Sequence, residues 1–208
     1  MSQGRRSRAE LPPACIRARE EWASCRSRST RRRRPRTLRD VVDAYISDHR
    51  RRAKATLTIY AHLPTLKDAV RRAAWAERPD RKREDHQRRL SRSSLGEAER
   101  RLDANPIRGV RSFEDLHAFL ERTIGDVPGI GELMVYDTAL RIGARLGVEP
   151  RLVFLHAGTR EGARALGLRT INGYLRPGEL PAAFRRLSPR EMEDCLCIFK
   201  ADLKRLAQ

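Results

Sequence analysis

One helix-start signal recurs along the chain and restricts the fold more than any other feature. A serine or threonine followed three residues later by aspartate or glutamate is typical of a helix N-terminus. The hydroxyl accepts from a backbone N–H there, and the carboxylate accepts from the backbone N–H of the capping residue. The pattern occurs at Thr37/Asp40, Thr65/Asp68, Ser94/Glu97, Ser112/Asp115 and Ser188/Glu191. These starts predict a chain built from helices.

Apolar residues follow the starts at helical spacing. The stripes are Leu38, Val41, Val42, Tyr45 and Ile46; Leu66, Ala69, Val70, Ala73 and Ala74; Phe113, Leu116, Phe119 and Leu120; Leu140, Ile142 and Leu146; and Met192, Leu196, Phe199 and Leu203. Only residues 152–155 offer a short, ambiguous strand pattern. We therefore predict an all-α fold, a compact domain of about eight to ten helices.

Positive charge is concentrated in the N-terminal part of the chain. The 208 residues carry 45 basic and 27 acidic side chains, a net charge of +18, and 40 of the basic residues are arginine. Residues 1–36 have a net charge of +9, residues 37–108 of +7 and residues 109–208 of only +2. Such an excess of arginine over lysine also arises from GC-rich coding sequence, so the placement of the charge is more informative than its total.

The composition also predicts the domain organisation. Residues 1–36 lack apolar periodicity, so we expect a disordered basic arm or a translated upstream stretch from a start codon assigned too early. Residues 37–208 are expected to form a single all-α domain, with a basic helical half over 37–108 and a nearly neutral half over 109–208. No apolar run of about 18 residues and no signal peptide occur, so we expect a cytoplasmic, bacterial-type protein without a membrane partner.

No metal or cofactor is predicted. Cys15 and Cys25 are too far apart for a zinc pair, and Cys195 and Cys197 point to different faces of a predicted helix. The thiols of this second pair are expected to pack as small hydrophobic groups.

The segment with the most chemical information is Pro128-Gly129-Ile130-Gly131, which lies between two amphipathic helices. Gly129 and Gly131 are expected to permit positive φ angles. The free N–H groups at the start of the second helix, from Gly131 onward, would attract an anion. A structural turn between helices remains the alternative.

This segment resembles the helix-hairpin-helix motif of DNA-binding proteins over residues 113–147. The resemblance implies a sequence-independent phosphate site at Gly129, Ile130 and Gly131. The following residues, Asp137-Thr138 and then Arg141, Ile142, Arg145, Leu146 and Gly147, are similar to a signature of endonuclease III-type DNA glycosylases. That similarity implies a catalytic role for Asp137, whereas the residues alone fit equally a core helix in which Asp137 makes a local hydrogen bond.

A second turn, residues 155–167, has a similar outline. Gly158 is expected to end one helix and Thr159 to cap the next, as in a degenerate second hairpin. Arg160 and Arg164 then lie one turn apart and could reach phosphate. His156 is either an acid–base candidate or a core histidine with a satisfied hydrogen bond.

Residues 78–94 are almost continuously polar. They form either a solvated helix or loop, or a basic strip along a groove made by Arg81, Lys82, Arg83, Arg88 and Arg89, with His86 and Gln87 adding hydrogen bonds.

The sequence predicts a non-catalytic protein that binds the nucleic-acid backbone, DNA more than RNA, through the hairpin and the arginine-rich half. The alternatives are an all-α protein-interaction domain, and a reduced glycosylase-like enzyme that uses Asp137. Residues 37–206 also resemble an uncharacterised family of small helical bacterial proteins, which implies no activity.

Overall fold

The computed structural model describes residues 12–25 and 34–208. Within these residues the chain forms ten α-helices and one pair of two-residue strands, so the predicted all-α class is confirmed. The helices are α1 (Pro13–Ser24), α2 (Leu38–Asp48), α3 (Arg50–Ala61), α4 (Leu66–Ala74), α5 (Arg92–Ala104), α6 (Phe113–Ile124), α7 (Glu132–Leu146), α8 (Ala157–Ala165), α9 (Pro189–Ile198) and α10 (Lys200–Leu206).

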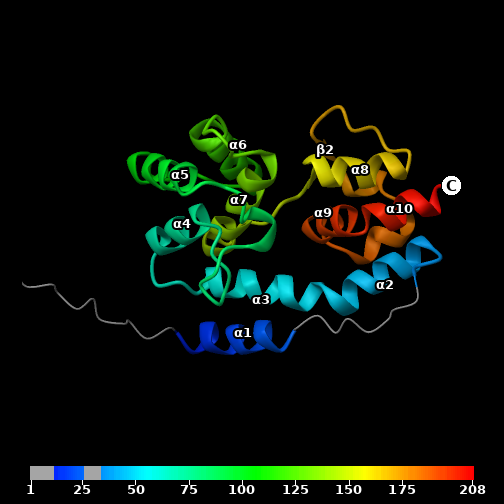
Figure 1. The fold of residues 1–208 in the computed structure, drawn as a ribbon, viewed down its shortest axis with the longest axis horizontal. Helices are drawn as coiled ribbons and strands as arrows, with labels where there is room; N and C mark the ends of the chain where they lie inside the picture. Colours follow the sequence, from blue (N-terminus) through cyan, green and yellow to red (C-terminus); the bar gives the residue numbers. More distant parts are fainter. Residues whose placement is uncertain (1–11, 26–33) are drawn as a thin grey trace, which may run out of the picture.

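The helices form two groups that share a base made by α2 and α3. Figure 1 shows α4 to α7 gathered over α3, and α8 to α10 gathered over α2. Each group has its own hydrophobic core: one runs from Tyr60 to Ile142, and the other joins Val41, Val42 and Tyr45 of α2 to residues 153–203. Apart from α2, which contributes to the second core, the boundary between the two cores lies after α7. The excess of positive charge, in contrast, ends at residue 108.

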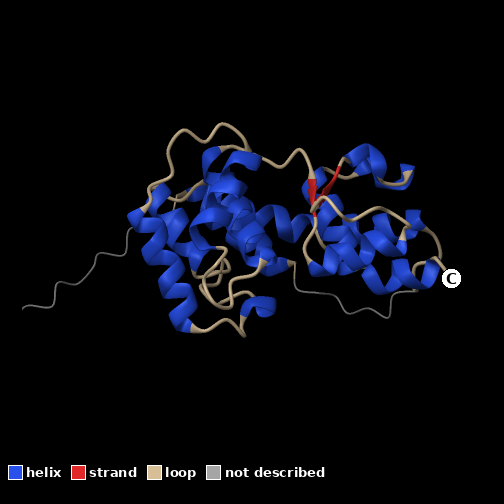
Figure 2. Ribbon diagram, turned by 90° about the horizontal axis from the view of Figure 1, so that it is seen from above, coloured by secondary structure: helices blue, strands red, loops and turns tan. Residues whose placement is uncertain are grey.

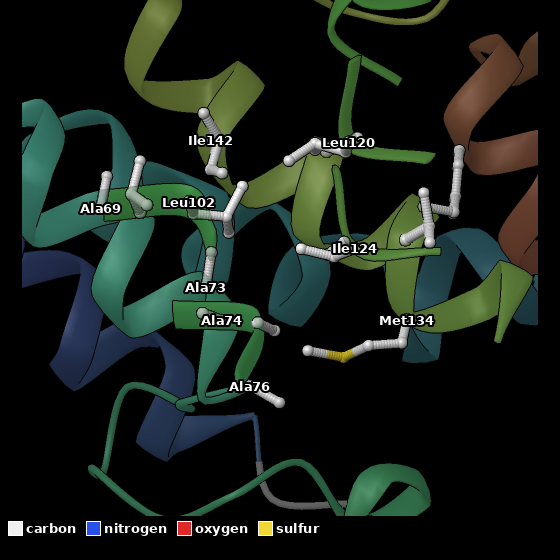
Figure 3. Packing of buried hydrophobic residues seen from close by; sticks show 14 of the residues in the cluster. Ala69, Ala73, Ala74, Ala76, Leu102, Leu120, Ile124, Met134 and Ile142 are labelled. Atoms are coloured by element: carbon white, nitrogen blue, oxygen red, sulfur yellow. The ribbon is translucent and has the colours of Figure 1, made fainter. Parts of the chain in front are cut away.

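The first core surrounds α7, which packs against α3, α4 and α6. In Figure 3 the small side chains of the α4 alanines allow α5 and α7, which carry Leu102 and Met134, to approach closely. Small side chains on one helix and long ones on its neighbours fill such a space at the density of a protein interior. This packing fixes the position of α7, and with it every side chain that α7 presents.

Four of the five predicted cap signals mark the start of a helix. Thr37, Ser112 and Ser188 make complete capping boxes, and the Thr65 hydroxyl accepts from the Asp68 N–H. The start predicted at Ser94 is wrong. Helix α5 begins one turn earlier, where the hydroxyl of Ser91 accepts from the Ser94 N–H at 2.9 Å.

Residues 13–24, expected to be part of a disordered arm, instead form α1, and α1 lies along α3 (Figure 1). Cys15 and Ala18 are buried, and the Cys15 thiol donates to the backbone oxygens of Ile59 and His62 at 3.5 and 3.4 Å. Small side chains at a three-residue spacing make this contact face, which is why hydrophobic periodicity missed it. The rest of the predicted arm falls largely on residues 1–11 and 26–33, which lie outside the described residues.

The strands β1 (Val153–Phe154) and β2 (Tyr174–Leu175) pair antiparallel. Figure 2 shows them where the chain passes from one group of helices to the other. No helix of the described ranges has the length and apolar character needed to span a bilayer.

Two helical glycines give a matched test of the packing. A Cβ on Gly162 of α8 would lie 2.2 Å from the Leu196 oxygen of α9, whereas one on Gly96 of α5 meets nothing within 4 Å. Gly162→Ala should therefore destabilise the protein by about 1–3 kcal/mol, because the two helices must separate. Gly96→Ala should stabilise it by about 0.5–1 kcal/mol. Chemical denaturation measures both; a Gly162→Ala variant as stable as the wild type would contradict the close α8–α9 contact.

Candidate functional site

The loop between α6 and α7 forms a tight turn over residues 127–130. The Ile130 N–H donates to the Val127 oxygen at 2.9 Å, and Gly129 has a φ of +87°, as position three of a type II turn requires. The expectation of a positive φ is confirmed at Gly129 and wrong at Gly131, whose φ is −109°. Gly131 is the extended N-cap residue of α7, and it has no side-chain cap bond.

The tip of this turn rests on the chain itself. The Ser94 hydroxyl donates to the Pro128 oxygen at 2.5 Å, and a Cβ on Gly129 would lie 3.4 Å from the same hydroxyl. Ile130 is buried, with 6% of its surface exposed. Of the three hairpin residues Gly129, Ile130 and Gly131, it is Gly131 that lines a cavity.

This cavity, which we call the hairpin cavity, has a volume of about 480 Å³. Gly131 and Arg160 both line it, so the structure brings these two predicted residues together. The Arg160 guanidinium, however, makes two hydrogen bonds to the Glu132 carboxylate, at 2.5 and 2.7 Å. This pairing lowers the pKa of Glu132, and the carboxylate therefore stays charged. Glu121 and Asp126 line the same cavity and add negative charge.

The second predicted turn differs in its details. Helix α8 begins at Ala157 with His156 as its N-cap residue, so Gly158 does not end a helix and Thr159 does not cap one. The Thr159 hydroxyl accepts instead from the His156 N–H at 3.1 Å. Arg164 is exposed and bonds Thr170 at 3.3 Å, away from the cavity lining.

His156 is a buried residue with a hydrogen-bond partner. Its Nε2 lies 2.5 Å from Oε1 of Glu193, which is equally buried. Burial lowers the pKa of His156 and raises the pKa of Glu193 well above its ordinary value. Both directions favour a neutral pair in which the Glu193 carboxyl donates to the imidazole.

Residues 75–91 form a structured loop that we call the basic loop. Arg78 anchors it from inside, with ion pairs to Asp80 and Asp85 at 2.6 and 3.0 Å. Arg83 donates to the Leu90 oxygen at 2.6 Å and is partly buried. The other residues of the predicted basic strip are exposed: Arg81, Lys82, Arg88 and Arg89.

The inner side of the basic loop contacts Asp137 of α7. His86 Nε2 lies 2.9 Å from Asp137 Oδ2, and Gln87 Nε2 donates to the same oxygen at 2.7 Å. Arg141, one turn later on α7, lies 3.5 Å from it. Asp137 is thus no isolated core residue: it receives hydrogen bonds from a segment 50 positions earlier in the chain.

The surroundings shift the pKa values of Asp137 and His86 in opposite directions. Burial alone would raise the pKa of Asp137, but Arg141 and His86 outweigh it, so the pKa lies below its ordinary value. The hydrogen bond to Asp137 raises the pKa of His86 above 6.5. A carboxylate can only accept, so Nε2 of His86 carries the hydrogen and Nδ1 of the neutral ring is left as the base.

Asp137, His86 and Arg141 line a second cavity of about 340 Å³, which we call the Asp137 cavity. Its other walls come from α1, α3 and α9, among them Trp22, Arg52 and Arg190. The guanidinium carbons of Arg52 and Arg78 lie 4.6 and 5.4 Å from the centre of the Trp22 ring. The His86 side chain is 49% exposed and that of Asp137 only 16%.

The hairpin and Asp137 therefore open onto different cavities. A glycosylase-like arrangement would need both at one nucleotide, and α7 instead presents Gly131 to the hairpin cavity and Asp137 to the Asp137 cavity. Sequence reasoning found Asp137 and His86 separately, but it did not find Trp22, Arg52 or Arg190. An aromatic residue among arginines in residues 17–26 was the available signal for Trp22.

The chain matches no protein-family model, and neither a curated protein nor a solved structure is significantly similar to it. Among the described residues, no group of three or more histidine, cysteine, aspartate or glutamate side chains is arranged to hold a metal ion.

The histidines should titrate in a fixed order. Burial lowers the pKa of His117 and of His156, whereas Asp137 raises that of His86. In an NMR titration His86 should be the only one of these three to titrate above 6.5. The stability from the His86–Asp137 pair is then full below pH 6.5 and is lost as the pH rises through the folded-state value.

Asp137→Asn is the matched variant for this titration. It should lower the pKa of His86 and leave that of His117 unchanged, because Asp137 is not among the groups that act on His117. An unchanged His86 titration would contradict the hydrogen bond.

Proposed function

We propose that this protein binds the nucleic-acid backbone, without sequence preference, on the face that joins the basic loop to the mouth of the Asp137 cavity. The observation that carries the proposal is the clustering of Trp22, Arg52 and Arg78 beside four exposed basic side chains of one loop. Proteins that bind strands without reading bases combine basic grooves with aromatic side chains and with cation–π contacts from arginine.

The charge around this face supports the proposal. Arg81 makes an ion pair with Glu77 at 3.5 Å, and its own side chain is 55% exposed, so water screens the pair. For Lys82 and Arg89 no ion pair is found among the described residues. Arg88 pairs with Asp85 at 2.8 Å, but both side chains are more than 60% exposed, so water screens the pair strongly. These cations can each neutralise a phosphate and release a counterion.

The charge at the hairpin argues against a phosphate there. The Arg160 guanidinium is already hydrogen-bonded to the Glu132 carboxylate, and Glu121 adds a second carboxylate to the same cavity. An anion at the N-terminus of α7 would gain from the helix dipole, but it would meet these carboxylates first. We therefore place the strand on the basic loop rather than on the Pro-Gly-Ile-Gly turn.

A protein-interaction domain is the other candidate function, and no observation favours it. The exposed large apolar residues of the described ranges are Ile16, Leu146, Ile171, Tyr174 and Ile198. They come from separate elements of the fold: α1, the end of α7, the loop before β2, β2 itself and α9. A docking surface would need such residues to form one contiguous patch.

Two double variants with the same change in charge distinguish the two phosphate sites. Arg88→Gln/Arg89→Gln should weaken binding of a single-stranded DNA and reduce the slope of log K against log salt by about 1.4, which is two contacts on a single strand. Arg160→Gln/Arg164→Gln should leave that slope unchanged. Fluorescence anisotropy across a salt series at low ionic strength measures both.

If the Arg160/Arg164 variant instead reduces the slope of log K against log salt and the Arg88/Arg89 variant does not, the phosphate site lies at the hairpin. Absence of salt-dependent binding by the wild type to both duplex and single-stranded DNA would overturn the nucleic-acid proposal and leave the interaction domain.

A further inference from the structure

We propose that His86, oriented by Asp137, is a general base that cleaves RNA strands at the mouth of the Asp137 cavity. The inference rests on the proposed function, because the binding face delivers the strand to this cavity. It adds an activity and a substrate class: single-stranded RNA, whose 2′-hydroxyl is the nucleophile that DNA lacks.

His86 is accessible to solvent, and the carboxylate that orients its ring is largely buried. Its side chain is half exposed at 49%, while the carboxylate that holds it is 16% exposed. Asp137 is itself held by Gln87 and Arg141, and the Arg141 side chain is only 6% exposed. This chain of contacts fixes both the ring orientation and the tautomer, so the lone pair of Nδ1 belongs to the side of the ring opposite Asp137.

The walls of the cavity supply the charge that a phosphodiester requires. Arg52 comes from α3, and Arg190 comes from α9. Arg190 is held by Asp194 at 3.1 Å, whereas Arg52 has its guanidinium over Trp22 and no ion pair among the described residues. Arg52 is therefore the cation best able to meet a phosphate oxygen.

The groups that face His86 come from every element around the cavity. They are Asp137 and Arg141 of α7, Glu84 and Asp85 of the basic loop, His49 between α2 and α3, Arg52 of α3, and Arg190 and Asp194 of α9. Burial raises the pKa of Glu84 above its ordinary value, and Arg141 lies 3.9 Å from its carboxylate. Asp85 is paired with Arg78 and Arg88.

The step conserves atoms and charge without a further reactant. Nδ1 of His86 removes the proton of a ribose 2′-hydroxyl, and the 2′-oxygen forms a bond to the adjacent phosphorus. The bond from phosphorus to the 5′-oxygen of the next nucleotide breaks, and that oxygen takes a proton from water at the open mouth of the cavity. The hydroxide left behind regains the proton from the imidazolium. The products are a 2′,3′-cyclic phosphate and a free 5′-hydroxyl.

The test uses the full chain, a single-stranded RNA and the same strand with 2′-deoxyribose throughout, in the presence of EDTA. The wild type should cleave the RNA to cyclic-phosphate ends and leave the deoxy strand intact. His86→Gln should slow cleavage by about 100-fold or more, the range of general base catalysis. The matched control His62→Gln, which changes an exposed histidine on α3's C-terminal side, should cleave at the wild-type rate.

The pH profile tests the supporting role of Asp137. Because the base must be neutral, the wild-type rate should rise with pH through the raised pKa of His86 and then level off. Asp137→Asn should move this limb to lower pH and lower the plateau. If Asp137 had only a structural role, Asp137→Asn would lower the plateau of the cleavage rate without shifting the pH at which the rate rises.

The outcomes separate the two proposals. Binding of the deoxy strand without cleavage of RNA overturns the general base and leaves the proposed function standing. Cleavage that persists in His86→Gln overturns it as well, because another group or a contaminant is then responsible. No binding of either strand overturns both.

Discussion

The ion pair between Asp137 and Arg141 is the interaction on which the arrangement of the rest depends. Both residues lie on α7, the helix at the centre of the first core, and both are largely buried. A buried carboxylate is tolerated only when it is paired and hydrogen-bonded. Here the second set of donors comes from His86 and Gln87, so satisfying Asp137 requires the basic loop to fold back onto α7.

This constraint has a cost that apolar residues would avoid. Replacing a buried ion pair with well-packed hydrophobic side chains is often neutral or stabilising, while removing one partner costs about 3–5 kcal/mol. Nη1 of Arg141 and Oε1 of Gln87 are buried without a hydrogen-bond partner among the described residues, which adds to the cost. An accessible histidine beside such a cluster, with its pKa raised, is the pattern typical of functional sites.

Local features of the fold could be predicted from the sequence, and long-range ones could not. The capping residues and the positive φ of Gly129 follow from interactions within four or five positions, so the pattern located them. The contact between His86 and Asp137 joins residues 51 positions apart, and nothing in either local pattern encodes it. Helix α1 was missed because its contact face is made of Cys15 and Ala18, which give little hydrophobic signal. The predicted helix start at Ser94 was wrong because Ser91, Ser93 and Ser94 are competing capping residues within one turn.

The central claim is that a strand lies across Trp22 and the basic loop rather than at the hairpin. Photo-crosslinking of a single strand that carries 4-thiouridine, followed by mass spectrometry of the linked peptides, measures this directly. A strand bound on this face should link to the peptides that contain Trp22 and residues 81–89, and the linkage should be lost as salt is raised. Linkage confined to residues 125–133 and 157–166 would contradict it.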